Sequence, residues 1–429
     1  MKLHRTIVAA SLAVVSAAAF AQAKEIKVGV IYDYTGAFAA GGSEAAGLGT
    51  KIAIDMLNEK GGVEGYKIVP IYADAQSKTE VAINEATRLM DQEKVHLLMG
   101  VFSSAHCVPM AQRVDSSKKF MWANVCVASS VFKDKKLSYV FRPQVHSDQF
   151  GEASCSYVHE NAKEKLGTDP KNVKIAVIYE DGPYGAGVAA GNESKCKSLG
   201  MNVVLKEGYA ATAPDLSSLV TKLKRARPDI ILHTGYNPDI TLFLRQSREQ
   251  GLKFKGLIGH GAGYGQIGKL METFGTDVNY FFNVDPVAAQ LLDPKTLKPG
   301  MGDLTKEMVK RYQAAKGPAD VPPHASMGFN QSWIFFTDVM PRAVKKYGGI
   351  DSEALRKAAL DTDIPVGGTI QGYGVKFFGP GTQMAGQNER SSPVVMQYNA
   401  NDTFVVWPAA IKTKDAVLPL PKGHAYAPQ

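Results

Sequence analysis

Residues 26–72 read IKVGVIYDYTGAFAAGGSEAAGLGTKIAIDMLNEKGGVEGYKIVPIY. The β-branched runs at 26–31 and 67–72 predict two buried strands. Between them, apolar residues from Ala46 to Leu57 recur at helical spacing, and Gly61-Gly62 predicts the end of that helix. A strand–helix–strand unit with connections this short forms a right-handed parallel crossover.

The same alternation continues along the chain and predicts an α/β fold. Because the strand-like runs are apolar throughout, we expect sheets covered by helices on both faces. Further strands are expected at 95–99, 173–179, 202–205, 230–232 and 256–258. Helices are expected at about 79–93, 106–118, 148–166, 185–199, 215–226 and 239–250.

The alternation of strands and helices is interrupted twice. One set of units ends near 142–146, where a new helix starts. After 281–286 the chain becomes rich in proline and then has helical spacing of apolar residues. Strand-like runs return at 394–398 and 404–406. We infer two doubly wound parallel-sheet lobes, between which the chain crosses more than once. Ligands of open α/β sheets bind beyond the carboxyl ends of the strands, so those ends are expected to line one cleft.

Residues 1–23 have the features of an export signal. Lys2 and Arg5 give a basic start, Thr6–Phe20 is almost entirely apolar, and Ala21-Gln22-Ala23 offers the small-x-small pattern of a signal peptidase site. The alternative is a membrane anchor. The apolar run is shorter than the roughly 20 residues that span a bilayer, and no stop-transfer flank follows. We therefore expect an exported protein.

Charge and cysteine content narrow the function classes. The formal net charge of the 429-residue chain is +8, and its Lys and Arg residues are interleaved with acids, which argues against nucleic-acid binding. Four cysteines in an exported chain form disulfides or remain buried thiols. Without a CxxC pair, a zinc site is not indicated. If disulfides form, the expected pairs are Cys107–Cys126, next to successive strands, and Cys155–Cys196, on helices that flank one strand.

The loops after the strands are rich in glycine, small hydroxyls and aromatic residues. Backbone N–H groups at helix N-termini attract anions, and aromatic rings give a ligand an apolar wall. For each serine the alternative is a helix cap, and for each tyrosine it is packing. The chain has no GxxxxGK[ST] or GxSxG motif, and its match to GxGxxG at 263–268 is weak evidence for a nucleotide in an exported protein. The loops concerned are 32–36, 100–105, 124–129, 179–185, 235–239 and 259–264.

Five segments carry a resemblance to a known family. They are IDMLNEKGGV (54–63), GVFSS (100–104), YGAG (184–187), GYNPD (235–239) and LRQSREQGL (244–252). With them the chain resembles the periplasmic leucine/isoleucine/valine-binding proteins, the branched-chain amino acid type of solute-binding subunit for ABC transporters.

The resemblance implies the type I periplasmic binding protein fold, two lobes joined by three crossovers that close on a ligand. Lobe I is expected to comprise 24–143 and 287–388, and lobe II 144–283 and 391–429. The crossovers are then near 142–146, 281–287 and 387–393.

The resemblance also implies site residues. Ser104 matches the serine that binds the ligand carboxylate, and Tyr184 and Tyr236 match aromatic walls of lobe II. Where the family keeps an acid for the α-ammonium, this chain has Gly261. A buried ammonium without a carboxylate is costly, so aromatic or aliphatic acids are favoured over branched-chain amino acids, unless Asp33, Glu180 or Asp181 reaches in. The other candidate ligand-binding residues are Phe102, Ser103, Cys126, Ala128, Ser129, His260 and Tyr264.

The function implied is that of a periplasmic solute-binding protein of an ABC importer. It captures a small carboxylate and presents it to a membrane permease, with no catalytic residue, metal or cofactor. We expect a monomer that binds no nucleic acid. The alternative is a ligand-sensing receptor on the same fold that reports to a signalling or regulatory partner.

The export signal predicts a mature N-terminus close to Lys24 and a protein that needs no detergent. Intact-mass analysis of the protein recovered from the periplasm is expected to show loss of residues 1–23. A recovered chain that retains Lys2 and Arg5 would contradict the cleavage site.

Overall fold

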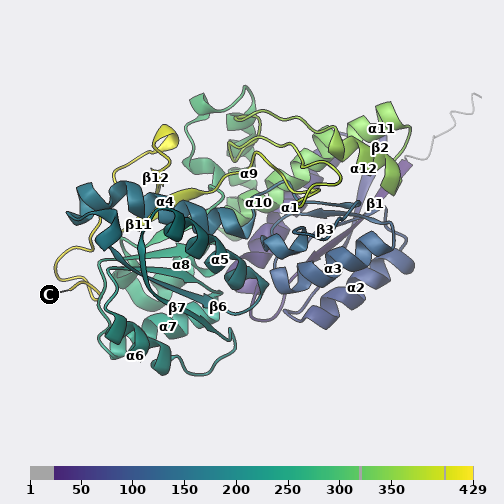
Figure 1. Ribbon diagram of the computed structural model, residues 1–429. Coiled ribbons are helices and arrows are strands. Elements are labelled where there is room, and N and C mark those ends of the chain that lie inside the picture. Colours follow the sequence, from purple (N-terminus) through teal and green to yellow (C-terminus); the bar gives the residue numbers. More distant parts are fainter. Residues whose placement is uncertain (1–23, 318–320, 401, 429) are drawn as a thin grey trace, which may run out of the picture.

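The computed structural model describes residues 24–317, 321–400 and 402–428, so the expected export signal at 1–23 lies outside the described residues. The described chain forms two α/β lobes that lie side by side, each built around its own sheet (Figure 1). This confirms the α/β fold class expected from the alternating pattern. No helix in the described ranges is long and apolar enough to cross a membrane.

The first lobe contains a five-stranded parallel sheet in the order β2-β1-β3-β4-β5. Three of its seven described helices come from the first 120 residues, and the other four from the second half of the chain. Its strands are β1 (Lys24–Tyr32), β2 (Tyr66–Asp74), β3 (Leu97–Gly100), β4 (Phe120–Ala123) and β5 (Val140–Phe141). Its helices are α1 (Glu44–Glu59), α2 (Thr79–Asp91), α3 (Ser104–Ser116), α9 (Met301–Lys316), α10 (Pro323–Ile334), α11 (Met340–Tyr347) and α12 (Ser352–Leu360).

The second lobe contains a seven-stranded sheet in the order β12-β11-β10-β9-β8-β6-β7. Strands β6–β10 are parallel, and the C-terminal hairpin β11–β12 adds antiparallel to β10. Its strands are β6 (Lys174–Glu180), β7 (Asn202–Tyr209), β8 (Ile230–Thr234), β9 (Gly256–His260), β10 (Phe282–Asp285), β11 (Val394–Asn399) and β12 (Asp402–Trp407). Its helices are α4 (Ser147–Leu166), α5 (Pro183–Ser198), α6 (Ser217–Ala226), α7 (Asn237–Glu249) and α8 (Ile267–Phe274).

The chain passes between the lobes three times: after β5, after β10 and before β11. The first and third passages are bonded to each other. Gln387 donates to the Gln144 carbonyl at 2.6 Å, and Asn388 donates to the Pro143 carbonyl. Arg142 Nε donates to Gln387 Oε1 at 2.6 Å. Because both passages are held as one pair, motion of the lobes is expected to bend them together.

Two disulfides brace the helices beside these passages. Cys107 on α3 is bonded to Cys126 in the loop after β4, and Cys155 on α4 is bonded to Cys196 on α5. All four cysteines are buried, at 1% exposure or less. The first bond therefore fixes a loop of lobe I, and the second joins two neighbouring helices of lobe II.

The disulfides predict that unreduced, denatured protein contains no thiol that iodoacetamide can modify. Replacing Cys155 and Cys196 together by alanine is expected to lower the free energy of unfolding by about 2–4 kcal/mol, because the unfolded chain regains the freedom of a long loop. Alkylation followed by mass spectrometry and chemical denaturation measure the two effects. Carbamidomethylation of any of the four cysteines without reductant would contradict the pairing.

Candidate functional site

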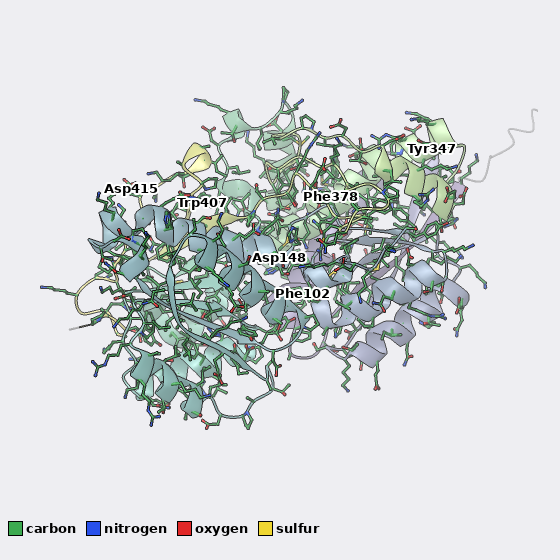
Figure 2. All side chains as sticks on the ribbon, in the orientation of Figure 1. Phe102, Asp148, Tyr347, Phe378, Trp407 and Asp415 are labelled. Carbon is green, nitrogen blue, oxygen red and sulfur yellow. A yellow bond between two sulfur atoms is a disulfide. The ribbon has the colours of Figure 1, made fainter. Side chains whose placement is uncertain are left out.

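A small cavity lies between the lobes at the carboxyl ends of their strands, with a free volume of about 30 Å³. Five residues singled out in the sequence line it: Phe102, Ser104, Tyr184, Tyr236 and Gly261. Seven further residues complete the wall: Val125, Val127, Phe150, Ala262, Asp285, His324 and Met327. Figure 2 places Phe102 at the junction of the two lobes.

Ser104 presents a hydroxyl whose proton is free to point into the cavity. It is the first residue of α3 and is 2% exposed. Its Oγ accepts hydrogen bonds from the backbone N–H groups of Val127 (3.3 Å) and Ala128 (3.1 Å). With both acceptor positions used, the O–H remains as a donor. The positive end of the α3 dipole also favours an anion here.

The backbone before α3 is strained, and this strain orients Phe102 and Ser104. Val101 has φ +66°, which is rare for a β-branched residue. Hydrogen bonds hold it on both sides: its N–H donates to the Ile31 carbonyl, and its carbonyl accepts from Cys126 N–H. The turn places Phe102 and Ser104 at the cavity wall.

Aromatic rings from both lobes line the cavity and pack against one another. The Tyr236 ring centroid is 4.4 Å from that of Phe38, 5.5 Å from that of Tyr184 and 6.3 Å from that of Phe102. Tyr184 OH donates to the His260 carbonyl at 2.6 Å, and Asp239 Oδ1 accepts from Tyr236 N–H at 2.9 Å. Burial raises the pKa of both tyrosines well above the usual value, so they line the cavity as neutral phenols.

Asp285 brings a carboxylate to the place where the sequence seemed to lack one. It ends β10 and is 1% exposed. A Cβ on Gly261 would stand 3.6 Å from Asp285 Oδ1, so the acid lies beside the position that the resemblance singles out. It accepts a long hydrogen bond from Asn283 Nδ2, at 3.4 Å. Burial raises the pKa of Asp285 well above its usual value.

The three other acids named from the sequence accept hydrogen bonds from backbone amides or are exposed to solvent. Asp33 accepts from Ser77 N–H at 2.8 Å, and burial raises its pKa to about 6. Glu180 accepts from the N–H groups of Gly182 and Gly185 and so caps α5. Asp181 is exposed. None of these three acids lines the cavity, and the acid that does is Asp285.

His324 closes one side of the cavity. It lies in the first turn of α10, and its ring centroid is 5.4 Å from that of Phe102. Gln266 Nε2, from lobe II, lies 3.1 Å from His324 Nδ1. Burial lowers the pKa of His324 to about 3, so the ring is neutral and does not supply a counter-charge to Asp285.

Six other candidate residues do not line the cavity, because their polar groups are engaged elsewhere. Ser103 caps α3 by accepting from Ala105 N–H, and its Oγ lies 3.5 Å from Tyr236 OH across the lobe boundary. Ser129 donates to Asp148 at 2.7 Å. Cys126 is in a disulfide, and Ala128 contributes its N–H to Ser104. His260 lies within 3.1 Å of Ser154 and Thr234, and Tyr264 OH lies 2.7 Å from His233.

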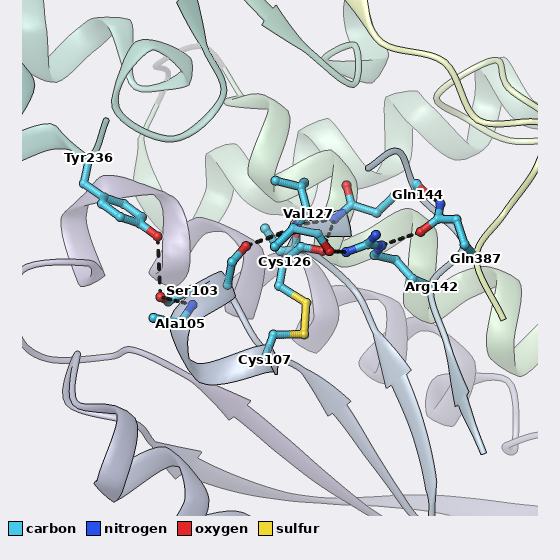
Figure 3. Close-up of a disulfide and its surroundings, with 12 residues drawn as sticks. Ser103, Ala105, Cys107, Cys126, Val127, Arg142, Gln144, Tyr236 and Gln387 are labelled. Carbon is cyan, nitrogen blue, oxygen red and sulfur yellow. Dashed lines mark hydrogen bonds between the residues drawn. A yellow bond between two sulfur atoms is a disulfide. The ribbon is translucent and has the colours of Figure 1, made fainter. Parts of the chain in front are cut away.

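The loop after β4 connects the cavity to the passages between the lobes (Figure 3). Val125 and Val127 line the cavity, while the Cys126 and Ala128 carbonyls accept from Arg142 Nη1 at 3.0 and 2.9 Å. Gln144 donates to the Val125 carbonyl. The Cys107–Cys126 bond ties the same loop to α3, which carries Ser104.

The cavity wall is mostly apolar and contains few polar groups. Among the described residues, no group of three or more His, Cys, Asp or Glu side chains is placed to hold a metal ion. The described residues that line the cavity include no Lys or Arg. An anion in the cavity therefore has hydroxyl and backbone donors as its partners. An apolar wall with a few converging polar groups is typical of ligand pockets.

Comparisons with known proteins assign the chain to a family. Residues 25–395 match the family model described as periplasmic binding protein. A "Leu/Ile/Val-binding protein homolog 7" of Brucella abortus is 32% identical over 418 residues, which cover 97% of this chain and 100% of that protein.

Two solved structures have the same fold. A leucine-binding protein of Thermotoga maritima has a TM-score of 0.72 at 22% identity, covering 89% of this chain and 97% of that one. A solute-binding protein of Rhodopseudomonas palustris in complex with 4-hydroxybenzoate has a TM-score of 0.69 at 16% identity, covering 92% and 98%. The chain belongs to the leucine/isoleucine/valine-binding branch of the periplasmic binding protein family.

Proposed function

We propose that this protein is the solute-binding subunit of an ABC importer, which captures a small carboxylate in the cavity between its lobes and delivers it to a membrane permease. Its family consists of binding proteins, and the proposal gives it no chemistry of its own. The observation that carries the proposal is the convergence of the Ser104 hydroxyl and the Asp285 carboxylate in one buried cavity between two lobes.

The Ser104 side of the cavity suits the carboxylate. A hydroxyl that accepts from two backbone amides and still has its proton to donate is oriented before the ligand arrives. A hydrogen bond to a charged group contributes about 1.5–3 kcal/mol. The α3 N-terminus adds a favourable field without a cationic side chain.

The Asp285 side of the cavity suits a cationic amine. A buried carboxylate is costly unless it is paired, and His324 beside it is neutral. An amine on the ligand would provide that pairing, so an amino acid satisfies both ends of the site. The absence of an acid at Gly261 favours simple acids, but Asp285 lies beside that position and shifts the proposal to amino acids with apolar side chains.

The remaining wall fits an apolar side chain. Phe102, Phe150, Tyr184, Tyr236 and Met327 come from both lobes and surround the two polar ends. A free volume of about 30 Å³ is room for about two water molecules. A bound amino acid therefore requires the lobes to stand further apart than in this structure, and the paired passages are where that movement would occur.

The proposed site of action is the periplasm, with the signal cleaved near Ala23. The ligand is released to permease subunits in the membrane, and the binding protein acts as a monomer without a cofactor. Co-purification of the ligand-bound protein with ABC permease subunits, rather than with a kinase or regulator, would test the transport assignment against the sensor alternative.

Replacing Ser104 by alanine is expected to weaken binding of a carboxylate ligand such as leucine by about 1.5–3 kcal/mol, because the ligand loses a charge-assisted hydrogen bond. The substitution also leaves the Val127 and Ala128 amides without their acceptor, so the free energy of unfolding is expected to fall by about 1–3 kcal/mol. Titration calorimetry and chemical denaturation separate the two losses. Ser117→Ala, at the exposed end of α3, is the control, and equal affinity of Ser104→Ala and wild type would remove Ser104 from the site.

Replacing Asp285 by asparagine is expected to weaken leucine binding by about 1.5–3 kcal/mol, since the amine loses its charged partner. Binding of 4-methylpentanoate, which has the same skeleton without the amine, is expected to stay equal or to improve. The paired titration is its own control for folding. Equal losses for both compounds would contradict the role of Asp285, and a wild-type protein that binds only 4-methylpentanoate would restore the preference for simple acids.

A further inference from the structure

Backbone hydrogen bonds tie the loop that donates to Ser104 to the end of strand β3. Asn124 N–H donates to the Gly100 carbonyl at 2.9 Å, and Cys126 N–H donates to the Val101 carbonyl at 3.0 Å. Both acceptors lie at or just after the end of β3, before α3 begins at Ser104. These bonds therefore fix the loop to the strand and not to the helix that carries the hydroxyl.

The loop is joined to α3 itself by two hydrogen bonds to Ser104 and by the Cys107–Cys126 disulfide. Cys107 lies three residues after Ser104, which is about one helical turn, and Cys126 directly precedes Val127. The disulfide and the hydrogen bonds therefore cross the same gap. At 3.1 and 3.3 Å, the hydrogen bonds are longer than most N–H···O bonds, so the covalent bond is the firmer tie.

The direction of the Ser104 O–H depends on this gap. While the Val127 and Ala128 N–H groups fill both acceptor positions of Ser104 Oγ, the proton is left for the cavity. If the loop separated from α3, these positions would be vacated and the hydroxyl would be free to turn. A ligand carboxylate would then have to order the side chain and the loop as it binds, which costs affinity.

We propose that the Cys107–Cys126 disulfide positions the carboxylate-binding hydroxyl, by holding residues 126–128 against α3 and so aiming Ser104 at the ligand. This inference rests on the proposed function, because it assumes that a carboxylate lies at Ser104. The contacts that carry it all lie within lobe I, so it does not depend on how far the lobes stand apart.

The second disulfide provides a matched control. The Cys155–Cys196 bond is equally buried and joins α4 to α5 in lobe II. It spans 41 residues of sequence, against 19 for Cys107–Cys126, so its loss is expected to destabilise the protein at least as much. An affinity loss that came from general destabilisation would therefore be at least as large without the Cys155–Cys196 bond.

Titration calorimetry with leucine and with 4-methylpentanoate compares wild type with two double variants. Cys107→Ala/Cys126→Ala is expected to bind both compounds about 3–10-fold more weakly than wild type, which corresponds to ordering one side chain on binding. Cys155→Ala/Cys196→Ala is expected to keep the wild-type affinity. Adding Ser104→Ala is expected to cost less affinity in the Cys107→Ala/Cys126→Ala variant than in wild type, because the hydroxyl is already misdirected there.

Wild type gives a second measurement if Cys107→Ala/Cys126→Ala does not fold. Coupling free energies are reciprocal, so a ligand that prefers the disulfide-bonded protein stabilises the bond by the same factor. Dithiothreitol reduces each bond to two thiols and becomes its own cyclic disulfide. In such buffers the tighter-binding compound is expected to favour the Cys107–Cys126 bond about 3–10-fold more than the Cys155–Cys196 bond, measured by alkylation and mass spectrometry.

Three results would overturn the positioning role: wild-type affinity without the Cys107–Cys126 bond, equal affinity losses in the two disulfide variants, or equal protection of both bonds by ligand. An undiminished effect of Ser104→Ala in the Cys107→Ala/Cys126→Ala variant would also overturn it, because the bond would then act elsewhere than on the hydroxyl. If wild type binds neither compound, the proposed ligand class fails and the inference fails with it. Binding by wild type without a loss specific to Cys107–Cys126 overturns the inference alone.

Discussion

The backbone of residues 124–128 is the constraint on which the rest of the structure depends. Its N–H groups donate to Ser104, its carbonyls accept from Arg142 and Gln144, and a disulfide ties it to α3. Burial lowers the pKa of Arg142 to about 9, so this guanidinium is costly to hold and depends on those carbonyls. Displacing the loop would therefore disturb the cavity wall and the passages between the lobes together. The cavity wall and the passages between the lobes therefore share one set of hydrogen bonds.

A buried acid with few hydrogen bonds explains why the cavity suits a ligand with an amine. Glu180 and Asp239, which flank the same cleft, have their oxygens satisfied by backbone amides or by the Tyr209 hydroxyl. Asp285 has one long contact with an amide. An acid that the protein leaves nearly unpaired inside a cavity is more informative about the ligand than any aromatic residue there, because aromatic rings also pack against one another without a ligand.

The sequence predicted the lobes because strand and helix periodicities are local. Phe102, Ser104, Tyr184, Tyr236 and Gly261 lie in loops that follow strands, the family resemblance singled out the last four, and all five line the cavity. The same rule applied to the strand at 281–286 could have found Asp285, which ends β10. Phe150, His324 and Met327 carried no such signal: they lie on helices that only the crossing chain brings to the cavity. Ser129, Cys126 and Ala128 share the loop composition, but tertiary hydrogen bonds direct them away.

Close packing, rather than nucleotide binding, explains most of the GxGxxG pattern at 263–268. A Cβ on Gly263 would stand 2.9 Å from the Asn237 amide nitrogen, and one on Gly265 would meet His324 and Asp285, whereas Gly268 has open space around it. Two of the three glycines are thus explained by close approach, one within lobe II and one between the lobes. Gly42, on the opposite lobe, meets the same His324 ring. Two backbones therefore press against one imidazole, and of the three glycines that match a nucleotide fingerprint, Gly265 is the one that lets the lobes meet beside Asp285.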